Sequence, residues 1–179
     1  WFEDLLGVTT DIKLLELGQK TPLLHRLERE APGSYQHTMV VATLAESAAE
    51  AINANALLTR VGAYYHDIGK MQKPAYFTEN QQTAADKTRH AKLKPQMSVL
   101  VIKNHVKYGL ELAREYKLPK IIQNFIPEHH GTTLISYFYH QVLANSPPDS
   151  VREEDFRYPG PKPRSKETAI LMIADSVEA

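Results

Sequence analysis

The sequence predicts an all-α protein that folds as a single domain. Apolar residues recur at helical spacing along most of the 179 residues, and no segment alternates polar and apolar residues for long enough to make a strand. Hydrophobic residues form 42% of the chain and charged residues 23%, as in ordinary globular domains. A chain of this length can bury a substantial core within one domain.

The first two helices are indicated by their capping residues. Thr21 can cap a helix that has proline at its first position, and this helix should run to Glu30 and end at the Pro-Gly pair 32–33. Ser34 should then cap a longer helix that reaches about Ala54. The inward stripe of this helix is predicted to be His37, Val41, Leu44, Ala48 and Ile52.

A third helix is expected from Asn55 to Ile68, with an adjacent histidine and aspartate in its last turn. Gly69 can supply the left-handed residue that commonly closes a helix, and Lys70 would face the negative end of the helix dipole. The inward residues of this helix are predicted to be Leu58, Val61, Tyr65 and Ile68.

The remaining helices alternate with two irregular segments. Segment 71–95 is polar and predicts a long connection, of the kind that often borders a functional site. Pro127 should interrupt the fifth helix and Gly131 should end it, whereas Ser165 should cap the last one. These helices are predicted at 96–116, 119–131, 133–145 and 166–179, with a second irregular segment at 146–164.

Composition limits the functions that the chain can have. Lys+Arg and Asp+Glu each number 21, so no net charge attracts a DNA or RNA polymer or an anionic membrane. No stretch approaches the roughly 20 apolar residues that cross a bilayer. The absence of cysteine excludes disulfides, thiolate ligands and cysteine nucleophiles, so any metal must be bound by histidine and carboxylate. The chain starts without methionine and ends within a helical pattern, so we expect it to be a piece of a longer protein.

Several ionisable residues stand where a helical protein places its core or its helix ends. Taken singly, a buried histidine is more often bonded to a backbone carbonyl than to a metal. An unpaired buried carboxylate, however, costs several kcal/mol unless a cation or donors meet it. Taken together, these residues predict one site with five imidazoles and two carboxylates: His37, His66, Asp67, His105, His129, His130 and Asp175.

This set of side chains is suited to a pair of transition-metal ions. Imidazole and carboxylate bind Fe, Mn, Zn or Ni, and seven ligands exceed what one tetrahedral ion accepts. A carboxylate can bridge two cations about 3.5–4 Å apart, an arrangement that serves phosphoester hydrolysis because the two ions stabilise the attacking and leaving oxygens. The residues therefore favour a dinuclear centre in the core.

The order H…HD…H…HH…D resembles the HD-domain metal-dependent phosphohydrolases in their two-metal form. Longer stretches are similar to the cytoplasmic domain of the seven-transmembrane HD receptor family, the PgpH-type cyclic di-AMP phosphodiesterases: "GSYQHTMVVATLAE", "YYHDIGKM", "YFTENQ", "KNHVKYGLELAREYKLP", "FIPEHHGTTLISYFYHQ" and "FRYPGPKPRSKETAILMIADSVEA". The resemblance implies a single HD domain over 1–179, with 1–33 as a lead-in from the membrane region and 34–179 as the HD core. It also implies a cytoplasmic domain of a bacterial membrane protein, attached through transmembrane segments outside this sequence.

The same resemblance implies a division of the ligands and a reaction. His37, His66, Asp67 and Asp175 would hold one ion, and Asp67, His105, His129 and His130 the other, so that Asp67 bridges the two. The ions would be Mn or Fe, and a hydroxide that they activate would attack phosphorus. The expected enzyme is a metal-dependent phosphodiesterase that hydrolyses cyclic di-AMP to linear 5′-pApA.

Further residues are candidates for substrate contacts. Lys70 joins Asp67 as a predicted catalytic residue, because an ammonium beside the metals suits a phosphate oxygen. Thr132 and Thr133 could donate to phosphate, and Tyr65 could stack on adenine, as could Tyr108, Tyr137 and Tyr139. A solvated lysine, a simple threonine cap and core tyrosines stay open as the alternatives.

Two other functions also stay open. Another HD-type nucleotide phosphohydrolase, acting on deoxynucleoside triphosphates, would use a similar metal core. A catalytically silent cyclic-dinucleotide sensor is the second, although every ligand position is filled. Cyclic di-GMP enzymes of the HD type carry Gly-Tyr-Pro after their histidine pair, whereas "TTLISYF" follows Gly131 here. Neither the native metal nor the oligomeric state follows from the sequence.

Overall fold

Helices joined by turns build the part of the chain that the computed structural model describes, residues 9–147 and 150–178. Within these residues there is no strand, and one isolated bridge pairs Leu134 with Arg157, so the all-α prediction is confirmed. None of the described helices is both long and apolar enough to cross a membrane. The α-helices are α2 (Asp11–Leu17), α3 (Pro22–Glu30), α4 (Pro32–Ala51), α5 (Ala56–Tyr65), α6 (Ala84–Lys87), α7 (Pro95–Glu115), α8 (Lys120–Gln123), α9 (Phe125–Glu128), α10 (Ser136–Leu143) and α11 (Lys166–Glu178).

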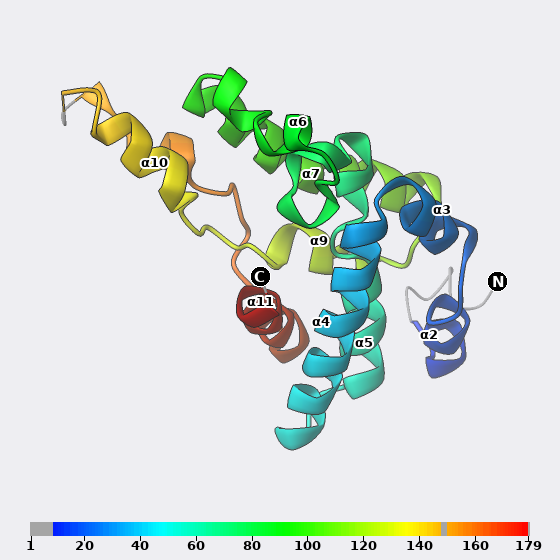
Figure 1. Cartoon of the computed structure of the whole chain (residues 1–179). Coiled ribbons are helices and arrows are strands. Elements are labelled where there is room, and N and C mark those ends of the chain that lie inside the picture. Colours follow the sequence, from blue (N-terminus) through cyan, green and yellow to red (C-terminus); the bar gives the residue numbers. More distant parts are fainter. Residues whose placement is uncertain (1–8, 148–149, 179) are drawn as a thin grey trace.

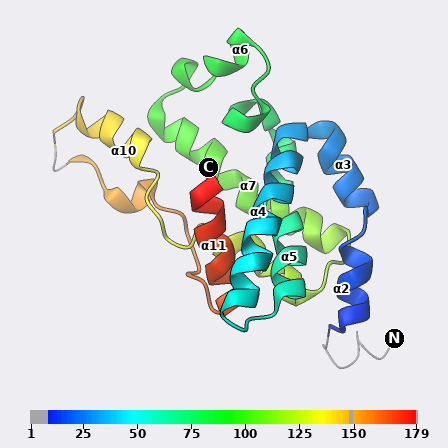
Figure 2. The ribbon, with the colours of Figure 1, turned by 60° about the horizontal axis from the view of Figure 1, so that its bottom comes forward.

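Helices α4 and α5 lie side by side at the centre, and α11 packs along α4 (Figure 1). Helix α7 packs against the turn that follows α5, whereas α2 and α3 cover one side of the central pair. Helix α10 lies at the opposite edge of the molecule from α2 in both views (Figure 1, Figure 2). The centre of the bundle is therefore surrounded by α4, α5, α7, α9 and α11.

The core is apolar and continuous across these helices. Leu27, Tyr65, Phe125 and Leu171 are at most 1% exposed and belong to one cluster that joins α3, α5, α9 and α11. Burying each large side chain stabilises the fold by about 1.5–3 kcal/mol, so this cluster fixes the helices that carry the functional residues. A second, smaller cluster holds α10 against α7 and consists of Val99, Phe138, Val142 and Phe156.

Helix α4 differs from its prediction in its start and in its buried face. It begins at Pro32, whereas the Pro-Gly pair 32–33 was predicted to end the preceding helix. Proline fits the first position of a helix, where its missing N–H is not needed. Ser34 is therefore a buried residue of the first turn and not a cap. The predicted inward stripe was wrong beyond Val41: Leu44, Ala48 and Ile52 line a shallow exposed groove with α11, while Ala42, Ala45 and Ala49 are buried.

The turn after α5 also differs from its prediction. The helix ends at Tyr65, a 3₁₀ helix follows at Ile68–Gln72, and Gly69 does not have the left-handed conformation. A Cβ added at Gly69 would lie 1.7 Å from the carbonyl oxygen of His105, so this glycine allows two backbones to touch. The contact places the adjacent histidine and aspartate against α7.

The other element predictions agree with the structure in outline. Helix α7 spans almost the predicted residues, and Gly131, with φ +53°, ends the segment that contains α9. The interruption of this segment was predicted at the wrong residue, because α8 and α9 meet at Asn124 and Pro127 lies inside α9. The polar connection 71–95 contains α6 and three short 3₁₀ turns, at 74–76, 78–80 and 90–92.

Candidate metal centre

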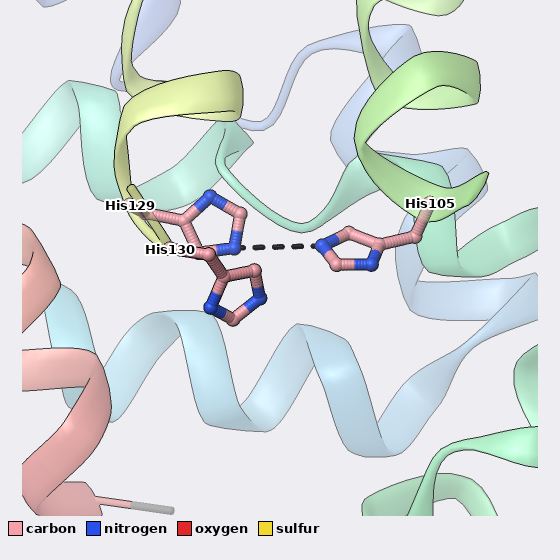
Figure 3. Close-up of side chains that lie close together, drawn as sticks. All are labelled: His105, His129 and His130. Carbon is pink, nitrogen blue, oxygen red and sulfur yellow. Dashed lines mark hydrogen bonds between the residues drawn. The ribbon is translucent and has the colours of Figure 1, made fainter. Parts of the chain in front are cut away.

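The seven predicted ligands converge at the centre of the bundle. They form two groups, within each of which the ligand atoms lie within 4.8 Å of one another. The three-histidine group comes from α7 and the end of α9 (Figure 3) and consists of His105, His129 and His130. The four-residue group comes from α4, the turn after α5 and α11, and consists of His37, His66, Asp67 and Asp175.

Asp67 connects the two groups, and its two carboxylate oxygens face different histidines. Oδ1 lies 3.5 Å from Nε2 of His105 and 3.6 Å from Nε2 of His129. Oδ2 lies 3.3 Å from Nε2 of His66 and 3.7 Å from Nε2 of His37. A carboxylate that is 1% exposed and lies between two sets of imidazole nitrogens has the position of a bridging ligand.

Backbone carbonyls fix the orientation of three of the imidazoles. Nδ1 of His66 bonds the carbonyl of Ala63 at 2.6 Å, and Nδ1 of His105 bonds that of Ile102 at 2.6 Å. Nδ1 of His129 bonds the carbonyl of Ile126 at 2.7 Å. Because a carbonyl only accepts, Nδ1 is the donor in each bond, so the lone pair of each ring, when the ring is neutral, lies on Nε2 and faces the centre.

Burial keeps the three-histidine group uncharged. Removal from water lowers the pKa of His105, brings that of His129 to about 3, and lowers that of His130 well below its ordinary value. At neutral pH these imidazoles are therefore neutral, and Nε2 of His105 and Nε2 of His129 carry no proton, as metal coordination requires.

In the four-residue group, charged neighbours shift the pKa values of His66 and Asp67 in the direction opposite to the effect of burial. Burial opposes a charge on His66, but the adjacent Asp67 carboxylate raises the pKa of this imidazole to about 10. Burial also opposes ionisation of Asp67, yet Lys70 and His66 hold its pKa well below the ordinary value. A divalent cation in this group would replace the proton on His66 as the partner of the carboxylates.

Two buried polar atoms of the centre test whether metal ions fit. Among the described residues, Nε2 of His66 and Oδ1 of Asp67 have no hydrogen-bond partner. An unpaired buried donor or acceptor costs about 1–3 kcal/mol, more where the group is charged. Both atoms face the centre, and imidazole nitrogen with carboxylate oxygen is a donor set that binds divalent transition metals. The residues therefore fit two divalent ions.

Lys70 lies beside the centre and is not a solvated helix-end residue. Its side chain is 13% exposed, and Nζ lies 2.7 Å from Oδ2 of Asp67 and 2.7 Å from Oε1 of Glu79. Burial disfavours the charged ammonium, but these two carboxylates raise its pKa above the ordinary value. Ser34 donates to the same oxygen of Glu79 at 2.9 Å, so Glu79 links Lys70 to the first turn of α4.

A cavity of about 820 Å³ opens from the metal centre and is large enough for a dinucleotide. His37, His105, His130 and Asp175 line its floor together with Lys70. Its walls combine polar residues with side chains that carry rings, and the latter come from the connection 71–95, α10 and the second irregular segment: Tyr76, Phe77, His90, Tyr137, Phe138 and Tyr158.

The other predicted substrate contacts lie elsewhere. Tyr65 is fully buried in the core, where its hydroxyl donates to the carbonyl of Leu17 at 2.8 Å. The hydroxyl of Thr133 donates to the carbonyl of His130 at 2.7 Å, and the carbonyl of Thr132 accepts from Arg157 at 2.9 Å. These two threonines therefore hold the turn after the histidine pair. Of the four tyrosines considered for stacking, Tyr137 reaches the cavity wall.

Sequence reasoning missed two residues near the centre, Glu178 and Tyr158, whereas His90 was not among the predicted ligands and lies in neither of the two groups. Glu178 contacts Nδ1 of His37, and its position one helical turn after Asp175 was a signal that could have identified it. Tyr158 stacks on His130 with ring centroids 4.1 Å apart, but it comes from a segment without periodicity. His90 donates through Nε2 to the carbonyl of Tyr76, 2.9 Å away, and lines the cavity outside both groups.

Comparison with protein families matches residues 34–179 to the HD domain. The chain belongs to the HD-domain family. This assignment confirms the resemblance seen in the motifs.

Individual relatives of this HD domain are named as enzymes. The cyclic-di-AMP phosphodiesterase PgpH of Bacillus subtilis is 48% identical over 180 residues, which cover 100% of this chain and 25% of the relative. PgpH of Listeria monocytogenes is 46% identical over 99% of this chain and 24% of its own length. The HD domain thus spans about a quarter of the curated relatives that it matches.

A solved structure is similar to this HD domain in both fold and sequence. The crystal structure of the L. monocytogenes PgpH HD domain in complex with cyclic di-AMP matches with a TM-score of 0.84 and 48% identity. The match covers 88% of this chain and 72% of the solved chain. The structure of the same domain described without cyclic di-AMP matches with a TM-score of 0.80.

Proposed function

We propose that this HD domain is a metal-dependent phosphodiesterase that hydrolyses cyclic di-AMP to linear 5′-pApA. The position of Asp67 carries the proposal, because its two oxygens face two groups of histidines that together fit a pair of divalent ions. The metals proposed are Mn or Fe, whose ligand preferences overlap. The named activity of the two PgpH relatives, and the cyclic di-AMP in the matching crystal structure, support the choice of substrate.

The seven ligands have complementary tasks in this proposal. The three neutral imidazoles of the three-histidine group would hold one ion, and the four-residue group would hold the other through its two carboxylates. Two ions so bound lower the pKa of water toward ~7 and stabilise negative charge on phosphate. Asp67 belongs to the four-residue group, but its Oδ1 also faces His105 and His129, so it would set the separation of the two binding positions.

Residues around the cavity would bind and orient the dinucleotide. Lys70 places an ammonium beside Asp67 at the cavity floor, where it can donate to a non-bridging phosphate oxygen. Glu79 also pairs with this ammonium, at 2.7 Å, and so helps to keep it in place. Tyr76, Phe77 and Phe138 offer aromatic surfaces on which adenine can stack.

The proposal is tested by incubating the purified domain with cyclic di-AMP, cyclic di-GMP and deoxynucleoside triphosphates in Mn²⁺, with chromatography of the products. We expect 5′-pApA from cyclic di-AMP and little product from the others. Asp67→Asn should abolish turnover, whereas His25→Ala, which changes a histidine with a 62% exposed side chain on α3, should not. Hydrolysis of triphosphates alone would support another HD-type nucleotide phosphohydrolase. Binding of cyclic di-AMP without hydrolysis would support a sensor.

We further propose that the domain works on the cytoplasmic side of a longer bacterial membrane protein. The family resemblance supports this placement, and the chain spans only 25% and 24% of the two PgpH relatives. Fractionation of cells that express the complete gene, with protease treatment of inverted and right-side-out vesicles, tests it. Cleavage of this domain in right-side-out vesicles would refute the placement.

A further inference from the structure

One ligand histidine is oriented differently from the three that bond backbone carbonyls. In His66, His105 and His129, Nδ1 contacts the carbonyl of the residue three positions earlier. Nδ1 of His37 instead contacts the carboxylate oxygen Oε2 of Glu178. The orientation of His37 therefore depends on a side chain from another helix.

Glu178 lies where it can control this ring. It belongs to the last turn of α11, three residues after Asp175, so both carboxylates lie on the same face of the helix. Asp175 approaches the other ring nitrogen of His37, with Oδ1 3.0 Å from Nε2. Two consecutive turns of α11 thus hold the two nitrogens of one imidazole. The side chain of Glu178 is 26% exposed and reaches the cavity wall.

We propose that Glu178 is a positioning residue that directs Nε2 of His37 to the metal centre. An ionised carboxylate only accepts hydrogen bonds, so Nδ1 of His37 donates to Glu178. When a cation replaces the proton between Nε2 and Asp175, the lone pair of the ring lies on Nε2 and faces that cation. Second partners of this kind orient ligating histidines and raise their basicity, and their loss typically weakens metal binding 10–100-fold. This inference rests on the proposed pair of divalent ions.

The expected effect is limited to one of the two binding positions. Without Glu178, the ring of His37 can rotate or place its proton on Nε2, which blocks coordination. None of the described hydrogen bonds and ion pairs of the three-histidine group involves Glu178, so this group should keep its affinity for metal. Glu178→Ala should therefore weaken one Mn²⁺ site about 10–100-fold and leave the other nearly unchanged. Glu178→Gln keeps an acceptor oxygen and should recover most of the loss.

The test is a calorimetric titration of metal-free wild type, Glu178→Ala and Glu178→Gln with Mn²⁺. Glu167→Gln is the matched control, because Glu167 lies on the same helix and bonds the backbone N–H of Asn55 instead. A second readout is ¹⁵N NMR of the histidine rings with diamagnetic Zn²⁺, in which His37 should be protonated at Nδ1 in wild type and lose this signature in Glu178→Ala. The melting temperature of the metal-free protein should match wild type in Glu178→Ala.

Each outcome decides the inference. Two ions per chain with one weakened site, restored by Glu178→Gln, support it. Unchanged affinities in Glu178→Ala, with two ions bound by wild type, would overturn this inference and leave the proposed function standing. Loss of one ion at all Mn²⁺ concentrations would also overturn it, because Glu178 would then be a ligand itself. Failure of wild type to bind two ions would overturn both.

Discussion

Replacing Gly69 by alanine is expected to push the turn that carries Asp67 away from α7. The added Cβ would lie 1.7 Å from the carbonyl oxygen of His105, 2.6 Å from the nitrogen of Gly109 and 2.7 Å from the carbonyl carbon of His105. All three are backbone atoms, so no side chain can rotate to make room. The two backbones themselves must separate.

The size of the separation follows from the closest contact. Cβ atoms essentially never approach another heavy atom closer than 3.0 Å. The carbonyl oxygen of His105 must therefore move about 1.3 Å away from the added Cβ, which would otherwise lie 1.7 Å from it. Forced overpacking costs about 1–3 kcal/mol, and a contact with rigid backbone should cost at least the upper value. Oδ1 of Asp67 now lies 3.5 Å from Nε2 of His105, and the same shift would take this pair outside the reach of a shared ion. A misplacement of about 1 Å can lower turnover about 100-fold.

Urea unfolding and steady-state kinetics with cyclic di-AMP in Mn²⁺ measure these two effects. Gly109→Ala is the control on the facing helix, because its Cβ would lie 3.0 Å from the side-chain atom Cγ2 of Ile126 and 3.4 Å from the nitrogen of Gly69. Ile126 can adjust, and alanine favours a helix by about 1 kcal/mol over glycine, so we expect little net change. Wild-type stability and turnover in Gly69→Ala would refute the reasoning.

Other substitutions test the ligands and their supports. Asp175→Asn should reduce the bound metal from two ions to one per chain by elemental analysis, and retention of both would contradict its assignment as a ligand. Lys70→Met should lower kcat for cyclic di-AMP at least tenfold with both ions still bound, because it removes a charge beside the phosphate, and an unchanged kcat would exclude that role. Glu128→Ala should destabilise the fold by about 1–3 kcal/mol in urea, since it removes the acceptor of the Arg164 N–H and the shorter of the hydrogen bonds that the buried Oγ1 of Thr168 donates. Tyr65→Phe should cost about 1 kcal/mol of stability without changing KM, because its hydroxyl bonds Leu17 in the core, and a raised KM would restore it as a substrate contact.

The convergence of the seven candidate ligands and most of the helices could be predicted, because their signals are local or ordered along the chain. Thr21 and Asn55 cap their helices as short-range hydrogen bonds require, and the seven ligands occur in a fixed order. The buried face of α4 was harder to predict, because alanine is only weakly apolar and packs by its small size. Ala45 and Ala49 are fully buried where helices approach closely, whereas the larger Leu44 is 42% exposed.

The contacts that depend on tertiary packing could not be predicted. Gly69 has the sequence signature of a helix end, and only the position of α7 shows that it is a point of backbone contact. The cavity wall includes Tyr76 and Phe77 from a connection without periodicity, so no pattern indicated which of its aromatic residues face the centre. The contact between Glu178 and His37 joins residues 141 positions apart.

The carbonyl contacts of His66, His105 and His129 also bear on how the centre withstands mutation. Each contact is supplied by the main chain three residues earlier, which every amino acid at that position provides. Substitution of the neighbouring side chains therefore leaves the orientation of these rings unchanged as long as the helices persist. His37 has no such backbone contact. A substitution of Glu178, in the last turn of α11, could therefore weaken the centre without replacing a proposed ligand.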